Sequence, residues 1–412
     1  MSGPKSENNA VLNGRVAHIV EHIRPGGGPS GYLYNLSSVA DKHPERLFDI
    51  LYATRSEERS HWKGSARFEL ILKILRAVSP VFREFLLLLI QGWNRKRQPR
   101  FVFSPEFTQK LNHYTCLVFH DVFKARIYAD NFSIKGQGIF VMPHSPSDIS
   151  MESIEDYENF LGGEIKKSIL LPKMQFEEID LYEKLDGIVA PSKYALEGYF
   201  DGNSPVRARL DHLLINKFHS VVTGVNLKAA SRQENYRTHI NPFGKKYIVG
   251  YFGRFNEQKG FDRYLKLVKA LEKETNIQFV CAGAGGIEVG SDNYKNLNNL
   301  GWIADDIAEY MASVDLIVAP NRVCYFDLAI LESLSLGTPV VASAVGGNKY
   351  FSRFAEGVYL FESDVDLAET VLATLSNLPA RAVVQTMYNE NFSTERFYDN
   401  HQQLAIDLLN QP

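Results

Sequence analysis

Short apolar runs that are typical of buried strands alternate with helix-like segments along almost the whole chain, and this alternation limits the choice of fold. In the first half, the runs that we predict as strands cover residues 16–23, 48–53, 101–104, 117–120, 139–143, 187–190 and 220–223. The pattern restarts in the second half with the runs KYIVGYFGRF, IQFVCAGAG, DLIVAP, TPVVAS and GVYLF. Strands that alternate with helices form parallel sheets with helices on both faces. We therefore predict an α/β fold with two open sheets, one in each half.

The length of the chain allows two domains. Its 412 residues, of which 45% are hydrophobic, are enough for two cores in domains of about 200 residues each. A polar stretch without an apolar period separates the two series of strands and is predicted to be a linker. We place a flexible tail at residues 1–12, a first domain at 13–228, the linker at 229–243, a second domain at 244–392, and a last helix at 393–412 that could pack back on the first domain.

Charge and cysteine content exclude several classes of protein. A formal net charge of -3 disfavours a nucleic-acid partner, which would need a concentrated cationic face. Cys116, Cys281 and Cys324 are isolated and lack zinc-ligand spacing, which favours a reduced cytosol. The first residues lack a secretory signal, and the longest apolar run, residues 85–90, is far shorter than the roughly 20 residues that span a bilayer. We expect a cytoplasmic protein without a transmembrane helix.

A glycine-rich turn follows the first predicted strand. Gly26, Gly27 and Gly28 precede a helix that begins near Gly31. Glycines let backbone N–H groups approach an anion, and a helix N-terminus favours negative charge. A flexible turn without a ligand is the alternative. The GxGxxG spacing of a dinucleotide site is absent from this turn, which disfavours an oxidoreductase.

The second half carries two cations at the end of its first strand. Gly253-Arg254 ends the strand, and Lys259-Gly260 stands at the start of the next helix. Two cations at the carboxyl edge of a sheet can hold a diphosphate and offset the charge of a departing nucleotide. An ordinary basic loop is the alternative.

A carboxylate near the start of a later helix is a further signal in this half. In the stretch CYFDLAILESLSLGTPVVAS, Glu332 lies about one turn into the helix. A carboxylate there can accept both ribose hydroxyls while the helix N-terminus holds the phosphates. A surface glutamate on an amphipathic helix is the alternative. Trp302 could flank a base or lie buried in the core.

Taken together, these motifs resemble family 4 of the retaining GT-B glycosyltransferases over nearly the whole chain. The matching features are the Arg254 and Lys259 pair, the turn at Gly283 and Gly285, and the block at residues 326–347. The resemblance implies two Rossmann-like domains that face each other across a cleft. It also implies transfer of a sugar from a nucleotide-diphosphate sugar to a hydroxyl acceptor with retention, without a metal and without a cofactor.

The resemblance further implies roles for individual residues. Arg254, Lys259 and His144 would be the catalytic residues, with His144 lining the reacting centre. The donor would contact Gly27, Gly28, Gly253, Gly285, Phe326, Asp327, Leu328 and Glu332. Further candidates for contact with the acceptor or the sugar are His120, Asp121 and Cys324.

Two residues depart from the pattern of this family. Cys324 stands where the family has the first glutamate of a pair, and a thiol cannot accept the hydroxyl hydrogen bonds that a carboxylate would. Asp327 stands where the family usually has glycine, and its carboxylate would compete with phosphate for the helix N–H groups. These departures motivate an alternative, a nucleotide-sugar-binding protein of the same fold that has lost catalysis. A scaffold protein that binds a partner in the cleft would leave the cation pair and Glu332 unexplained.

The implied partners are a UDP- or GDP-linked sugar and a glycan or lipid-linked acceptor, as in the assembly of surface polysaccharide, lipopolysaccharide or glycolipid. We expect no metal site, because Asp305 and Asp306 are adjacent, open a helix and form no DxD pair. Residues 66–100 form a basic amphipathic segment with two interpretations. One is peripheral contact with an anionic membrane at the cytoplasmic face, where each surface cation contributes roughly 1 kcal/mol. The other is a pair of helices that bury their apolar face.

Overall fold

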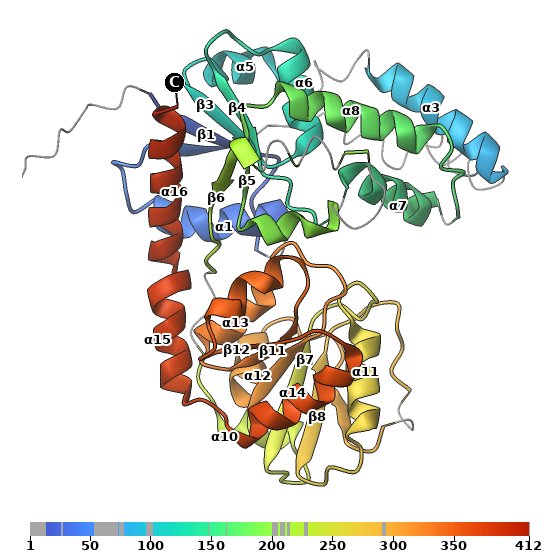
Figure 1. Cartoon of the computed structure of the whole chain (residues 1–412), viewed down its shortest axis with the longest axis vertical. Coiled ribbons are helices and arrows are strands. Elements are labelled where there is room, and N and C mark those ends of the chain that lie inside the picture. The colour runs from blue at the N-terminus through green and yellow to red at the C-terminus, as the bar shows by residue number, and fades with distance from the viewer. Residues whose placement is uncertain are drawn as a thin grey trace, which may run out of the picture.

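The computed structural model describes residues 14–25, 28–52, 73, 78–95, 102–146, 148–161, 163–199, 205–206, 211, 215–225, 230–290 and 294–411. These residues form two α/β domains, and the last helices of the chain run along one side of both (Figure 1). The expected tail at residues 1–12, Gly27, and residues 66–72, 74–77 and 96–100 of the amphipathic segment lie outside the described residues.

The first domain contains a parallel six-stranded sheet in the order β2-β1-β3-β4-β5-β6. The strands are β1 (Val16–Val20), β2 (Phe48–Tyr52), β3 (Cys116–Phe119), β4 (Gly138–Val141), β5 (Gly187–Ala190) and β6 (Phe218–Ser220). The helices are α1 (Gly28–Ala40), α3 (Pro80–Arg95), α5 (Pro105–Leu111), α6 (Val122–Asn131), α7 (Ile149–Leu161), α8 (Leu170–Lys184) and the 3-10 helix η2 (Lys193–Tyr199). The strand order reverses between β1 and β3, where a crevice opens beyond the carboxyl ends of the strands.

The second domain repeats this architecture with the strand order β12-β11-β10-β7-β8-β9. The strands are β7 (Tyr247–Phe252), β8 (Ile277–Ala282), β9 (Leu297–Asn299), β10 (Leu316–Ala319), β11 (Val340–Ser343) and β12 (Val358–Phe361). The helices are α10 (Glu234–Ile240), α11 (Phe261–Ala270), α12 (Ile307–Ser313), α13 (Leu328–Ser335), α14 (Asp364–Ser376), α15 (Arg381–Phe392) and the 3-10 helix η3 (Gly346–Arg353). The order reverses between β7 and β10, which face the first domain.

The strands of the second sheet read as continuous apolar runs because both of their faces are covered. Alternate residues of β7 enter different cores: Ile248 packs with Ile330 of α13, whereas Val249 packs with Tyr264 of α11. All six residues of β8 are buried. This arrangement confirms the predicted α/β class with two Rossmann-like domains.

The end of the chain returns to the first domain. Helix α16 (Thr394–Leu409) begins at Ser393, whose hydroxyl accepts a hydrogen bond from the Arg396 N–H. Phe397 and Leu404 of this helix are buried in a core that they share with β1 and α1. Gly224 lies against the junction of α15 and α16, where an added Cβ would come within 2.8 Å of the Phe392 carbonyl oxygen.

Four sequence predictions about secondary structure are corrected. Residues 102–104 form no strand; Ser104 instead caps α5 by accepting a hydrogen bond from the Phe107 N–H, and the buried Phe103 packs beside Phe107. The strand predicted at 220–223 lies earlier, as β6. The short polar strand β9 was missed. The predicted linker at 229–243 contains α10, because Ile240 is buried in the core of the second domain.

No helix within the described ranges is both long and apolar enough to span a bilayer.

Candidate active site

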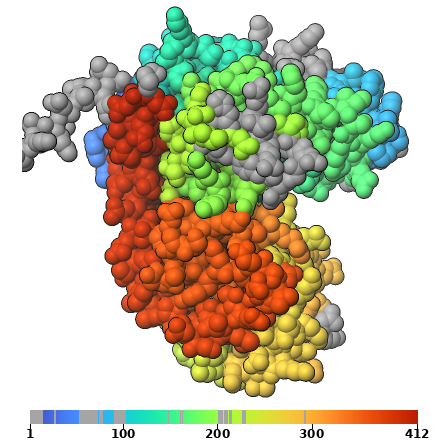
Figure 2. Space-filling view, viewed as in Figure 1, coloured from blue at the N-terminus to red at the C-terminus, as the bar shows by residue number. Residues whose placement is uncertain are grey.

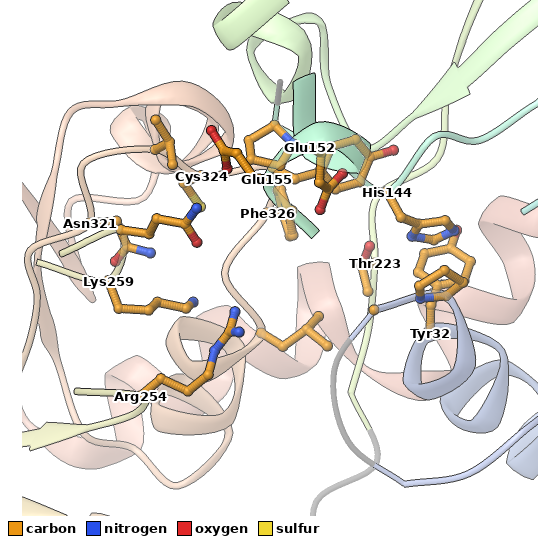
Figure 3. A pocket seen from close by; sticks show the side chains of 17 residues that line it. Tyr32, His144, Glu152, Glu155, Thr223, Arg254, Lys259, Asn321, Cys324 and Phe326 are labelled. Atoms are coloured by element: carbon orange, nitrogen blue, oxygen red, sulfur yellow. The ribbon is translucent and has the colours of Figure 1, made fainter. Parts of the chain in front are cut away.

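A cavity of about 350 Å³ lies between the two domains, and both contribute to its walls (Figure 3). The second domain provides Arg254, Gln258, Lys259, Asn321, Val323, Cys324, Tyr325, Phe326 and Leu328. The first domain and the segment after β6 provide Gly28, Pro29, Tyr32, His144, Pro146, Glu152, Glu155 and Thr223. These residues lie beyond the carboxyl ends of strands or in the helices that follow them. In the second domain they flank the reversal of strand order between β7 and β10.

The cationic side of the cavity depends on the loop between β7 and α11. Arg254 follows β7, and Lys259 precedes α11. Gly260 adopts the left-handed conformation with φ +67°, and an added Cβ would lie 1.8 Å from the carbonyl oxygen of Pro320. A residue with a side chain would therefore push this loop away from β10. The glycine brings both cations next to the loop that follows β10.

Asp327 occupies the position between Lys259 and the start of α13. Its carboxylate lies 3.0 Å from Lys259 Nζ, accepts a hydrogen bond of 2.8 Å from Asn321 Nδ2, and caps α13 by accepting from the Ala329 N–H. Burial alone would raise the pKa of Asp327, but Lys259 and these hydrogen bonds lower it below its usual value. Burial likewise opposes the charge of Lys259, yet Asp327 raises the pKa of that lysine. The pair is therefore ionised, and Lys259 already has an internal counter-ion.

Glu332 lies one helical turn beyond Leu328 on α13 and does not line the cavity. Burial raises its pKa to about 7, and the nearby negative charge of Asp327 adds to this effect, while Lys259 opposes it. The carboxyl group thus belongs to the same electrostatic cluster as Lys259 and Asp327.

Cys324 lines the cavity, but its thiol is engaged inside the protein. The sulfur atom donates a hydrogen bond of 3.1 Å to Asn348 Oδ1. Burial, together with the charge of Asp327, raises the pKa of the thiol. The backbone here is clamped by η3, because Cβ atoms at Gly346 and Gly347 would clash with the carbonyl groups of Cys324 and Tyr325. Cys324 is therefore a neutral hydrogen-bond donor.

His144 forms part of the opposite wall and has a constrained geometry. It is the one residue other than glycine with a positive φ, 54°, in the described part of the chain, a conformation that usually needs support from its surroundings. Its Nε2 lies 2.7 Å from His120 Nδ1, and its ring packs against Tyr32 at a centroid distance of 4.9 Å. Burial, followed by the neighbouring His18, lowers the pKa of His144 to about 3, so the ring is neutral.

Two carboxylates on α7 also line the cavity, and the sequence analysis did not identify them. Glu152 and Glu155 are spaced so that both lie on one face of α7. Burial raises the pKa of Glu152. Acidic residues near a helix start are expected on electrostatic grounds alone, so only their position directly after the His144 loop could have marked them as site residues.

The remaining candidates lie away from the cavity. Gly253 and Gly285 do not line it, and Gly285 packs on the backbone of Phe255. His120 is buried behind His144, and Asp121 caps α6 and pairs with Lys124. Direct substrate contact therefore does not fit His120 or Asp121. Trp302 is 74% exposed, which excludes a place in the core.

The second domain matches a known family. Residues 246–377 match the model described as glycosyl transferases group 1. An uncharacterized glycosyltransferase of Methanocaldococcus jannaschii, MJ1178, is 25% identical over 227 residues, which cover 51% of this chain and 56% of that protein. The O-antigen biosynthesis glycosyltransferase WclY of Escherichia coli is 29% identical over 118 residues, which cover 27% of this chain and 32% of that protein. The chain thus matches about half or less of the length of these curated relatives.

Solved structures with the same fold cover almost the whole chain. HepE of Anabaena in complex with UDP has a TM-score of 0.58 at 14% identity and covers 96% of this chain and 100% of that one. The catalytic domain of starch synthase IV from Arabidopsis thaliana, bound to ADP and acarbose, has a TM-score of 0.63 at 13% identity, with 97% and 100% coverage. At these identities the likeness concerns the fold, and it agrees with the arrangement of the two sheets.

The raised pKa of Glu332 leads to a prediction about stability and pH. The carboxyl group titrates near 4.5 in the unfolded chain and near 7 in the folded one. Between these values the folded chain retains a proton that the unfolded chain has released, so the free energy of unfolding falls as the pH rises. Glu332→Gln should remove this fall. The difference in Tm between variant and wild type should grow from about pH 4.5 to 7 and then stay constant.

Thermal unfolding over a pH series measures this difference, with Glu362→Gln at an exposed site as the control. A Tm difference for Glu332→Gln that does not vary with pH would contradict the raised pKa.

Proposed function

We propose that this GT-B chain, whose second domain belongs to the glycosyl transferases group 1 family, transfers a sugar from a nucleotide-diphosphate sugar to a hydroxyl group. The observation that carries the proposal is the convergence of Arg254 and Lys259 on a cavity that both domains line. A volume of about 350 Å³ is within the range of small-molecule sites.

In this proposal the diphosphate of the donor binds to the second domain. Arg254 can form paired hydrogen bonds with phosphate oxygens, and Lys259 and the N–H groups at the start of α13 face the same cavity. The UDP bound to HepE and the ADP bound to starch synthase IV support a nucleoside diphosphate as the ligand class.

We further propose that the transfer proceeds with retention and without a metal ion. The acceptor hydroxyl attacks the anomeric carbon on the face from which the nucleotide leaves, the bond to the diphosphate breaks, and the departing phosphate takes the proton. Arg254 and Lys259 stabilise the charge that develops on this phosphate. Neither step assigns proton abstraction to His144, whose low pKa makes it a poor base. Turnover that persists in EDTA would support metal independence.

The sugar end of the site differs from the usual pattern of the family. The Cys324 thiol donates to Asn348, and its sulfur atom is only a weak acceptor for a sugar hydroxyl. Glu152 and Glu155 face the same cavity from the first domain and can accept such hydrogen bonds. We propose that they contact hydroxyl groups of the transferred sugar or of a glycan or lipid-linked acceptor, in the assembly of polysaccharide, lipopolysaccharide or glycolipid.

The second candidate function is nucleotide-sugar binding without catalysis. It is favoured by one observation: Asp327 holds Lys259 in an ion pair and caps α13 with the same carboxylate. In that case the cations would bind the donor without stabilising a transition state.

Lys259→Ala distinguishes the two candidate functions. If Lys259 stabilises the departing diphosphate, its loss should cost on the order of 2.7–4 kcal/mol of transition-state stabilisation, or about a hundredfold or more in turnover. Lys266→Ala on the exposed face of α11, the helix that follows Lys259, is the matched control. Release of UDP or GDP from a panel of nucleotide sugars measures turnover. Transfer or donor hydrolysis at wild-type rates in Lys259→Ala would refute the role of Lys259 in stabilising the departing diphosphate, whereas donor binding without turnover by the wild type would favour the second candidate.

Asp327→Asn tests how the internal counter-ion affects donor binding. Asparagine is an equally good helix cap, so the change removes the charge while it keeps the shape. Lys259 and the N-terminus of α13 would then face the ligand without a competing anion, and we expect the Kd for UDP or GDP to fall about tenfold. Isothermal titration calorimetry measures this Kd, with Asp364→Asn, whose partner Arg263 lies outside the cavity, as control. An unchanged or weaker Kd would show that Asp327 does not compete with phosphate.

Membrane contact remains a proposal for the first domain. Helix α3 carries Val81, Phe82, Phe85 and Leu89 at exposures between 47% and 55%, with the spacing of one helical face. We expect the chain to float with vesicles that contain phosphatidylglycerol, and the double change Phe82→Asp and Phe85→Asp to abolish this. Phe176→Asp changes an exposed phenylalanine of α8 and should leave flotation intact. No flotation of the wild type at low salt would remove the idea.

A further inference from the structure

A chain of hydrogen-bonded side chains connects the last helix to the cavity. His401 of α16 lies with its Nδ1 3.3 Å from Nε2 of His18 on β1. Nδ1 of His18 lies 3.0 Å from Nε2 of His120, and Nδ1 of His120 lies 2.7 Å from Nε2 of His144. At the far end, the hydroxyl group of Tyr32 lies 2.8 Å from Nε2 of His401. We call these residues the histidine chain.

The hydrogen bonds of the histidine chain can all point in one of only two directions, toward His144 or away from it. Its rings are neutral, because burial lowers the pKa of His18 and of His144 to about 3 and lowers those of His120 and His401 well below the usual value. A neutral imidazole has one N–H donor and one acceptor nitrogen. In a chain of such rings each tautomer therefore determines the next one.

The hydroxyl group of Tyr32 determines in which direction the hydrogen bonds of the histidine chain point. Burial raises the pKa of its hydroxyl group well above the usual value, so the group keeps its proton. Its hydrogen-bond partner among the described residues is Nε2 of His401. If His401 donated to the hydroxyl oxygen, the buried hydroxyl proton would have no acceptor, which is unfavourable. Tyr32 therefore donates to His401, and every ring in turn donates from Nδ1 to Nε2 of the next.

We propose that Tyr32, His401, His18 and His120 are positioning residues that hold His144 in its Nδ1–H tautomer, so that His144 presents a hydrogen-bond donor to the cavity. Nδ1 of His144 is its second ring nitrogen and has no partner within the described part of the chain, whereas Nε2 is occupied by His120. The group that it would bind is an oxygen with a free lone pair, in a hydroxyl group or a phosphate of the ligand. The identity of that ligand rests on the proposed function, but the tautomer does not.

The packing around His144 leaves its ring little freedom to turn. The rings of His144 and His120 are stacked at a centroid distance of 5.0 Å, and Tyr32 meets His144 edge-on. Figure 3 shows the Tyr32 and His144 side chains together on one wall of the cavity. The histidine chain and this packing thus determine both the orientation of the His144 ring and which of its nitrogens carries the proton.

The first experiment locates the protons directly. In the full chain labelled with 15N-histidine, nitrogen chemical shifts and two-bond couplings report which ring nitrogen carries hydrogen, and single His→Gln variants assign the signals. We expect the Nδ1–H form for His144, His120, His18 and His401 at neutral pH. An Nε2–H form or an imidazolium at His144 would overturn the proposal.

The second experiment interrupts the histidine chain at a residue that lies outside the cavity. His401 does not line the cavity, so a change there acts on His144 only through the chain. His401→Leu should give His144 a mixture of tautomers and lower kcat roughly tenfold with little change in KM. In His401→Gln, the side-chain amide can accept from Tyr32 and donate to His18, so both readouts should return toward wild type.

Phe397→Leu is the control, because Phe397 packs against both Tyr32 and His401 without joining the chain. An unchanged His144 tautomer in His401→Leu, or equal effects of His401→Leu and Phe397→Leu on the tautomer, would refute the proposal. If the tautomers are as expected and no nucleotide sugar is turned over, the proposed function fails and the positioning role stands.

Discussion

The reversal of strand order between β7 and β10 is the constraint on which the rest of the site depends. It opens a crevice at the carboxyl edge of the second sheet, and the loops after these two strands must meet there. They can meet because Gly260 leaves room for the carbonyl group of Pro320. This contact between the two loops places Arg254 and Lys259 beside the start of α13. The cations, the helix N-terminus and the facing wall of the first domain therefore converge through backbone geometry.

Asp327 changes the electrostatics of the site where the two cations and the start of α13 come together. Its carboxylate is only 6% exposed. It pairs with Lys259, caps α13, and adds to the effect of burial in raising the pKa of Glu332. A single residue thus acts on Lys259, on the start of α13 and on Glu332. The carboxylate also keeps Lys259 directed toward α13 before a ligand binds. In the proposed function, a diphosphate that binds in the cavity would share Lys259 with Asp327.

Much of the fold could be predicted from the sequence, because buried parallel strands appear as apolar runs bounded by turns. The prediction failed at residues 102–104, where the helix-start signal of Ser104 and Pro105 outweighed the apolar run. The cations of the site were found because Arg254 and Lys259 are close in sequence. The histidine chain was not, because its residues come from β1, α1, the end of β3, the loop after β4, and α16. Such contacts arise only in the folded chain, and the same holds for Glu152 and Glu155.

The last two helices contact both the segment after β6 and the residues behind the cavity wall. The hydroxyl group of Tyr388 on α15 donates to the Val225 carbonyl group, and Asn400 on α16 donates to that of Val222, so the two helices hold the segment that joins the domains. A further contact joins the two domains directly, because Glu197 of η2 accepts a hydrogen bond from the Gly346 N–H of η3. Because α16 also carries His401, a shift of this helix that reoriented the domains would also disturb the hydrogen bonds that reach His144. Helix α16 thus contacts both the segment that follows β6, through Asn400, and the histidine chain, through His401.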